Sequence, residues 1–447
     1  MAKANLNAWV SGWHWRDRIL NFEPSWFTII MGTGVLQTCY VNFPYPITGG
    51  ARWLRDIGYC LWILEVVLFA IFIAFLLIRY ISHPELFKKN LLEFPNSSYL
   101  GAIAISWNTI IQGIVSYYDY RSSAVWVCFV MYWMALAGSV LVTIGIIIVQ
   151  MVRAQKQDLS DVAGVWVMTT VPLFATASTA GVLLPFINRE STKCAIAVLV
   201  TGYMGWFTAI CELMFILSIF FYRLISLKLP AQPVVASSFL PIAALSQAAF
   251  AIHKMSVYLS NYLVSTRYGP TQSIPPPLSA ATIQATAEAM HWLGILLSLG
   301  LLAHATFWVC QATAGILFTL PIKSFNIAHW SLVFPLASYA NAWSLLSRDL
   351  RNDGMRGWAA TFTVITTVLW LFCSMMTCYH GFWKGSLFTA PGLEDWLGDR
   401  DDQDEESRGG RRDNWNGTYT LSQSCSKRDL EDGVGPSNGD SQARRRN

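Results

Sequence analysis

The chain has 447 residues, of which 54% are hydrophobic and only 13% are charged. Soluble domains carry roughly 25% charged residues, and here the charges fall mostly between long apolar runs, so the composition excludes a soluble protein and indicates a membrane protein with several spans. Most of the nine cysteines lie inside those runs without CxxC or other metal-ligand spacing, so we expect neither a disulfide framework nor a zinc site.

Residues 1–21 are predicted to form a cytoplasmic leader. Within it, Trp9, Trp13 and Leu20 share one helical face, which is typical of a short helix at the membrane interface. Ten apolar stretches follow, each of about 20 residues or more, and together they make residues 22–385 a transmembrane transport domain. The predicted spans are 22–41, 57–78, 98–117, 124–149, 165–186, 195–221, 239–263, 283–318, 325–347 and 358–380.

The two ends of the chain are predicted to lie on the same side of the membrane, because the number of spans is even. Placing the amino terminus in the cytoplasm puts most of the 31 Lys and Arg residues on the cytoplasmic side, as the positive-inside rule requires. Residues 386–447 are polar, with an acidic run at 399–406 and few bulky aliphatic side chains. Such a segment cannot form an apolar core, so we expect a disordered cytoplasmic tail.

Five prolines recur about every 70 to 90 residues, each near or inside an odd-numbered span, which indicates repeated helical hairpins. They are Pro24, Pro95, Pro172, Pro241 and Pro335. A proline inside a helix leaves a backbone carbonyl without its hydrogen bond, and lipid does not tolerate broken backbone. The odd spans are therefore predicted to line a polar path inside the bundle.

Small and hydroxylated residues also gather in the odd spans, at 31–34, 169–181 and 241–251, whereas the even spans are rich in Leu, Ile, Phe and Trp. We therefore predict an all-α protein of ten helices in five hairpins, with an inner ring of kinked odd helices around one pore and an outer ring of even helices. The residues predicted along the pore are Gly32, Gly34, Thr176, Gln247 and Pro335. For the two glycines, close helix contact is the alternative role.

Few ionisable residues lie within the spans, and intramembrane charge is usually functional or paired. Lys254 and Glu288 fall at a similar depth in one hairpin, counted at about 1.5 Å per residue. A structural ion pair between them is the favoured interpretation. The alternative is that Lys254 faces the pore and attracts anions.

Several of these stretches carry a family resemblance. The opening span NFEPSWFTIIMGTG (21–34), the following NFPYP (42–46), residues 171–181, residues 241–252 with Gln247, and residues 329–335, which end in Phe-Pro, resemble the fungal sulfite efflux pumps. These belong to the tellurite-resistance and dicarboxylate transporter family, which includes yeast malate permease and the slow anion channel of plant guard cells. The likeness spans residues 22–384, and departs from the family pattern at His329-Trp330, where relatives often have paired tryptophans.

The resemblance implies a homotrimer of ten-helix subunits whose pores are each occluded by a phenylalanine. Phe334, beside Pro335, matches that gate, and Gly32 would leave space for its ring. The alternative for Phe334 is ordinary packing between helices. A hydrophobic obstruction of this kind controls permeation by dewetting or by blocking the lumen.

An enzyme is disfavoured, because the chain has no nucleotide loop, no HExxH motif and no catalytic triad. His291 and His304 are spaced for two haems, but no other helix carries a matching pair. We therefore expect no cofactor and no nucleic-acid partner, and the resemblance implies efflux of sulfite or hydrogen sulfite across the lipid of the plasma membrane. A dicarboxylate (malate) transporter or a less selective anion channel of the same family is the alternative, although the odd spans contain no Arg to bind a second carboxylate. A channel and a proton-coupled transporter both fit.

Overall fold

The computed structural model describes residues 19–45, 52–118, 121–153, 157–230, 235–266, 279–320 and 325–383. The chain divides into two compact units, Met1–Ala390 and Pro391–Asn447, and all described residues belong to the first. The predicted interfacial helix and the predicted tail lie outside the described residues, apart from the end of the leader at Ile19 and Leu20.

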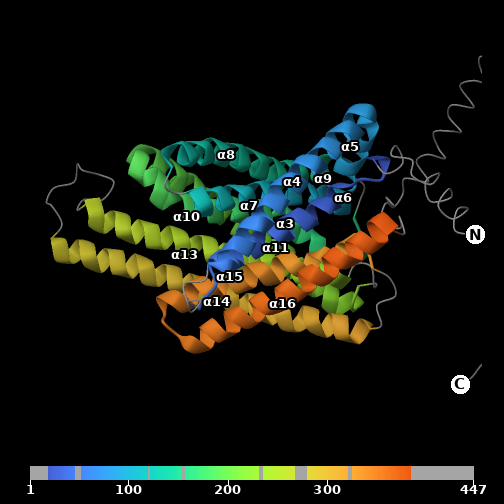
Figure 1. The fold of residues 1–447 in the computed structure, drawn as a ribbon. Coiled ribbons are helices and arrows are strands. Elements are labelled where there is room, and N and C mark those ends of the chain that lie inside the picture. Colours follow the sequence, from blue (N-terminus) through green and yellow to red (C-terminus); the bar gives the residue numbers. More distant parts are fainter. Residues whose placement is uncertain are drawn as a thin grey trace, which may run out of the picture. The chain divides into compact units, whose positions relative to one another are not determined.

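Within the described ranges, ten main helices form five hairpins (Figure 1). In each hairpin the two helices pack against each other. The hairpins are α3 (Phe27–Val41) with α4 (Trp53–Ser82), α7 (Leu100–Tyr118) with α8 (Ser122–Val140), α10 (Val171–Glu190) with α11 (Thr192–Leu227), α13 (Leu240–Thr266) with α14 (Ala280–Thr319), and α15 (Val333–Asp349) with α16 (Asp353–Thr377).

Shorter helical segments connect or extend the hairpins. After α8, the helix continues through the π-helical turn η2 (Leu141–Ile146) into α9 (Ile147–Val152). A π segment after α16, η7, spans Cys378–Trp383. Between α4 and α7 lie α5 (Pro84–Leu92) and α6 (Phe94–Ser98), and the 3-10 turn η3 (Leu159–Asp161) precedes the fifth span.

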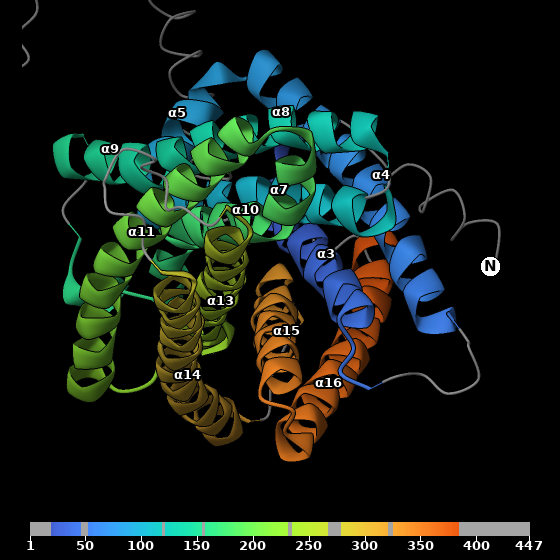
Figure 2. The same cartoon turned by 90° about the vertical axis from the view of Figure 1, so that its left-hand side faces the viewer.

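The first helix of each hairpin belongs to a closed inner ring, in which α3 contacts α7, α7 contacts α10, α10 contacts α13, α13 contacts α15 and α15 contacts α3 again. Figure 2 shows these five helices around a common centre with their hairpin partners outside them. In the most apolar 18-residue stretch of each helix, between 72% and 100% of the stretch is buried in α7, α10 and α13, against 22% to 33% in the outer helices. The exposed apolar side chains of the outer ring therefore form the surface that would meet lipid.

Eight of the described helices are long and apolar enough to cross a membrane, by length and composition. The other two predicted spans correspond to α3 and α15, which have 15 and 17 residues and are each preceded by a 3-10 turn. The prediction of an all-α membrane fold with inner odd and outer even helices is thus confirmed.

All five prolines lie near the starts of helical segments, where the predicted spans already placed Pro24, Pro95 and Pro241, whereas Pro172 and Pro335 were expected inside their spans. Each lies in the first turn of a helix or of the short segment before it. A backbone N–H there has no acceptor within the helix, so its absence in proline breaks no hydrogen bond. Pro24 begins the 3-10 helix η1 (Pro24–Trp26) and Pro95 lies in α6, whereas Pro172, Pro241 and Pro335 are the second or third residues of their α-helices. The stretch around Phe334 is thus not one helix with a central proline, because the 3-10 helix η6 (Ile327–Leu332) ends where α15 begins.

Two backbone carbonyls at the junction before Pro172 face protein, one of the two environments that a membrane allows for broken backbone. Before Pro172, in the 3-10 helix η4 (Gly164–Thr169), the carbonyl of Thr169 accepts a hydrogen bond of 2.7 Å from the Thr143 hydroxyl of the outer ring. The Met168 carbonyl lies against Gly101, where an added Cβ would come within 2.5 Å of the oxygen. These particular carbonyls are therefore buried in helix contacts and do not line an open path.

Candidate functional site

Buried and half-buried polar side chains join all five pairs of neighbouring inner helices, and we call them the polar belt. Gln247 of α13 connects two neighbours, accepting from Ser178 of α10 at 2.9 Å and donating to Ser338 of α15 at 3.0 Å. The belt is completed by bonds from Gln112 to Thr179 (3.0 Å), from Tyr117 to Gln37 (3.2 Å) and from Asn42 to Asn341 (3.0 Å). Because these side chains bond to one another across each interface, the belt holds the ring closed in this structure.

Thr176 and Gln247, two of the predicted pore residues, lie in or beside this belt. The Thr176 hydroxyl accepts from the Asn108 amide at 3.1 Å and lies 2.9 Å from the Ser139 hydroxyl of α8. It therefore faces the contact between α10, α7 and α8 and is 1% exposed. Gln247 is 6% exposed and bonds within the inner ring.

A cavity of about 560 Å³ opens at the carboxyl-terminal ends of the inner helices. Four of the five inner helices contribute to it, with Thr38 and Asn42 at the end of α3, Gln112 on α7, and further side chains on α10 and α13. Asn42 and Gln112 also belong to the polar belt, so the cavity adjoins the belt.

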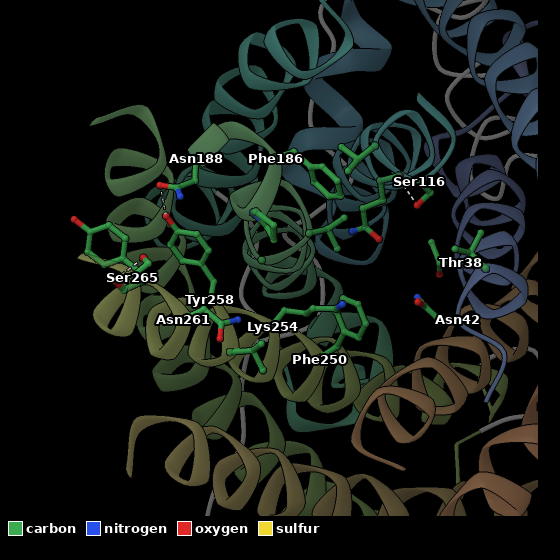
Figure 3. Close-up of a pocket in the computed structure, with 18 of the residues that line it drawn as sticks. Thr38, Asn42, Ser116, Phe186, Asn188, Phe250, Lys254, Tyr258, Asn261 and Ser265 are labelled. Atoms are coloured by element: carbon green, nitrogen blue, oxygen red, sulfur yellow. Dashed lines mark hydrogen bonds between the residues drawn. The ribbon is translucent and has the colours of Figure 1, made fainter. Parts of the chain in front are cut away.

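The charges of the cavity are all positive among its described lining residues, since these include Lys254 and Arg55 but neither Asp nor Glu. Figure 3 shows the Lys254 side chain extending from α13 into the cavity, past the Phe250 ring and toward Asn42. The ammonium lies 5.9 Å from the centre of that ring. Arg55 donates to the carbonyl of Ser116 at 2.9 Å. Cationic groups in a concave site attract a small anion, and amide donors there partly replace its hydration shell.

Glu288 lies elsewhere. It is exposed on α14 and accepts a hydrogen bond of 2.8 Å from Gln284 one turn earlier. No ion pair joins it to Lys254, although both residues are described. In the structure Lys254 therefore lines the cavity and does not pair with Glu288.

The two glycines of α3 lie at close helix contacts. A Cβ on Gly34 would overlap the carboxylate of Glu65 and come within 2.5 Å of the Thr109 hydroxyl, whose O–H donates to that carboxylate. A Cβ on Gly32 would lie 3.3 Å from Val333 and 3.5 Å from the Trp330 ring. At Gly32 the nearest neighbours are thus Val333 and Trp330, the residues that lead into α15.

Phe334 is fully buried at the second position of α15, and Pro335 follows it. Ser338 and Asn341 come four and seven residues after Phe334, so all three fall on one helical face. Since Ser338 and Asn341 belong to the polar belt, this is the face of α15 that carries the belt.

Several cavity residues were absent from the sequence prediction. Arg55 lies before the predicted second span, and Asn42 follows the predicted first span, so both were counted as loop residues. Pro185, a proline in the interior of α10, also lines the cavity. Pro185 was not selected because it does not fit the regular spacing of the other five prolines, although an interior proline in an apolar helix is itself a signal of irregular backbone.

The comparisons with known proteins agree with this architecture. The family model described as "Voltage-dependent anion channel" matches residues 21–378. The sulfite efflux pump of Arthroderma benhamiae is 26% identical over 371 residues, which cover 82% of this chain and 92% of the pump. That of Candida albicans is 21% identical over 81% of this chain and 73% of its own length.

A shorter match links the chain to the malic acid transport protein of Schizosaccharomyces pombe, 29% identical over 125 residues and 28% of each chain. These family and relative names are those of transporters and channels, not of enzymes. With the family model matching most of the sequence, and with a closed ring of helices that fits it, the chain belongs to the voltage-dependent anion channel family.

Proposed function

We propose that this protein exports sulfite or hydrogen sulfite across the plasma membrane through the ring of inner helices. The observation that carries the proposal is the cavity at one end of the ring, which holds Lys254 and Arg55 and no described acidic side chain. A small anion would be attracted there electrostatically, and the hydroxyl and amide groups of the polar belt would replace its water as it passes. The amino-terminal ends of the inner α-helices add positive dipole ends farther along the path.

The sulfite substrate comes from the relatives named as sulfite efflux pumps, which align over four fifths of the chain. Both chain ends would be cytoplasmic, with residues 386–447 as a disordered tail, so the cavity at the carboxyl-terminal ends of the inner helices would open to the outside. The assembly would be a homotrimer held by apolar surfaces of the outer ring.

Phe334 is proposed to close the path next to the polar belt. It shares a face of α15 with Ser338, and four residues of helix place it about 6 Å from Ser338 along the axis. A buried apolar ring at that point would exclude water from the lumen, and an ion cannot pass a dewetted constriction.

The test is anion flux from proteoliposomes containing the purified full-length chain, with sulfite, malate, chloride and nitrate compared under one membrane potential. Malate is the competing substrate class, because Arg55 and Lys254 line the same cavity and could each bind one carboxylate. We expect sulfite to leave faster than malate. Malate flux equal to or faster than sulfite flux would contradict the proposed substrate, and no flux of any anion would contradict the proposed pore.

A further inference from the structure

A cluster of two histidines and one aspartate lies outside the proposed transport path. His253 of α13, His291 of α14 and Asp349 at the end of α15 bring three potential metal-ligand atoms together, all within 4.8 Å of one another. The Nε2 atoms of His253 and His291 lie 2.8 Å and 3.1 Å from the same oxygen, Oδ2 of Asp349. We propose that this cluster binds a divalent transition-metal ion, Zn²⁺ being the best match.

The donor set suits zinc. Imidazole nitrogen and carboxylate oxygen bind Zn²⁺ at about 2.0–2.2 Å, so two ligands of a tetrahedral ion stand about 3.3–3.5 Å apart. The two His–Asp separations of 2.8 Å and 3.1 Å need to widen by about half an ångström to reach that spacing, and the two imidazole nitrogens, which lie within 4.8 Å of each other, need to adopt the same spacing. One carboxylate charge and two neutral imidazoles would then hold the ion, with a fourth position open to water.

The helices that carry the ligands are held in place by packing. One turn beyond His253 and His291, Gly294 of α14 lies directly against Ser256 of α13, where any Cβ would overlap the serine hydroxyl. That hydroxyl donates to the backbone carbonyl of His253 at 2.8 Å. The end of α15 is anchored separately, because Arg348 donates to the carbonyl of Phe43 at 3.0 Å. Fixed backbones let the three ligands converge without long-range rearrangement.

Access and charge also permit binding. The His291 and Asp349 side chains are 36% and 28% exposed, whereas that of His253 is 2% exposed, so an ion can enter from one side onto a buried ligand. Two cations adjoin the cluster in sequence, and both are directed elsewhere: Lys254 extends into the cavity (Figure 3), which His253 does not line, and Arg348 donates to the carbonyl of Phe43. The ion would connect two inner helices and one outer helix at the proposed outer end of the ring.

Zinc binding is tested on the full-length chain purified without a polyhistidine tag and stripped with a chelator. Calorimetric titration with ZnCl₂ should show one saturable site per chain, and zinc should raise the thermal unfolding midpoint, since an ion that binds only the folded state stabilises it. Magnesium, which prefers oxygen ligands, should do neither. Because the readout is binding, the result does not depend on sulfite being the substrate.

Two variants locate the site. His291→Ala and Asp349→Asn should each weaken zinc binding by at least about tenfold, the smallest loss expected for removing even an outer partner of a metal ligand. His304→Ala is the matched control, a half-buried histidine on the same helix that bonds to Trp308, and it should bind zinc like the unmodified chain. Absence of a saturable site would overturn the proposal. So would site variants that fold normally without zinc and bind zinc as tightly as the unmodified chain. The cluster would then be a hydrogen-bonded contact between helices.

Discussion

At the residue scale, Lys254 brings a positive charge into a cavity that has no described acidic lining residue. Counting residues along two helices placed Lys254 and Glu288 at a similar depth and suggested a pair, but such a count does not give the direction of either side chain. Each residue turns a helix by about 100°, so a small error in helix phase decides whether a side chain faces a partner on the next helix or a cavity. In the structure Glu288 is bonded to Gln284 on its own helix.

Replacing Lys254 by Met should therefore lower anion flux while leaving the fold intact. A focused charge raises the encounter rate of a counter-ion by tenfold or more, so we expect a loss of roughly tenfold at low ionic strength. The loss should shrink at high salt, where the charge is screened. Glu288→Gln is the control and should change neither flux nor thermal stability. Loss of stability in Lys254→Met with normal flux per folded protein would show that the lysine is structural.

Phe334 offers a second test at this scale. If its ring closes the path, Phe334→Ala should raise flux and leave the order of preference among anions nearly unchanged, because the donors elsewhere set selectivity. Sulfite flux per folded protein and the unfolding midpoint are measured on the same sample. A phenylalanine that only packs would behave differently: truncation would cost about 3–5 kcal/mol, and the variant would conduct no better.

At the scale of the helix, periodicity and composition were sufficient to predict which helices form the inner ring, because small and hydroxylated residues are useful only where helices approach closely. A break near each inner helix was predicted from its proline, but Pro172 and Pro335 were expected inside their spans. The prolines lie in first turns, where 3-10 and α-helical segments meet, and no local sequence signal distinguishes that junction from a central kink. Prediction of the polar belt requires the three-dimensional register of all five inner helices, so its hydrogen bonds could not be predicted one residue pair at a time.

Glycine positions test the packing of these helices. In Gly34→Ala the added methyl group would overlap the Glu65 carboxylate, and we expect a loss of about 1–3 kcal/mol or a failure to fold. Gly300→Ala on the outer helix α14 is the matched control. Nothing lies within 4 Å of a Cβ there, so the better helix propensity of alanine should leave stability unchanged or slightly higher. Equal unfolding midpoints for the two variants would contradict the close contact between α3, α4 and α7.

At the scale of the whole molecule, described residues between 22 and 383 form the closed ring and its hairpins. Composition predicts that the polar segment from 386 onward has too little apolar surface to fold, so truncation after Ser386 should leave insertion, detergent stability and sulfite flux largely intact. Size-exclusion chromatography and flux on the truncated chain provide the check. Aggregation of the truncated protein would mean that the tail packs against the transport domain.

The grouping of His253, His291 and Asp349 shows what sequence patterns miss at this scale. The three ligands come from three helices and are separated by 38 and 58 residues, so no short motif contains them. Only the closing of the ring brings the end of α15 against the hairpin of α13 and α14. Predicted metal sites depend on local spacing, which this cluster lacks.

The central claim is that anions pass through the cavity beside Lys254, and charge reversal at that position tests it most directly. In proteoliposomes, the Lys254→Cys variant is treated with a thiol reagent that attaches either an ammonium or a sulfonate group, with the unmodified chain and its native cysteines as the control. We predict that the variant conducts sulfite slowly, that the ammonium reagent restores flux, that the sulfonate reagent lowers it further, and that neither reagent affects the unmodified chain. Equal flux after both reagents, with labelling of the introduced thiol verified by mass, would place the path of the anion elsewhere.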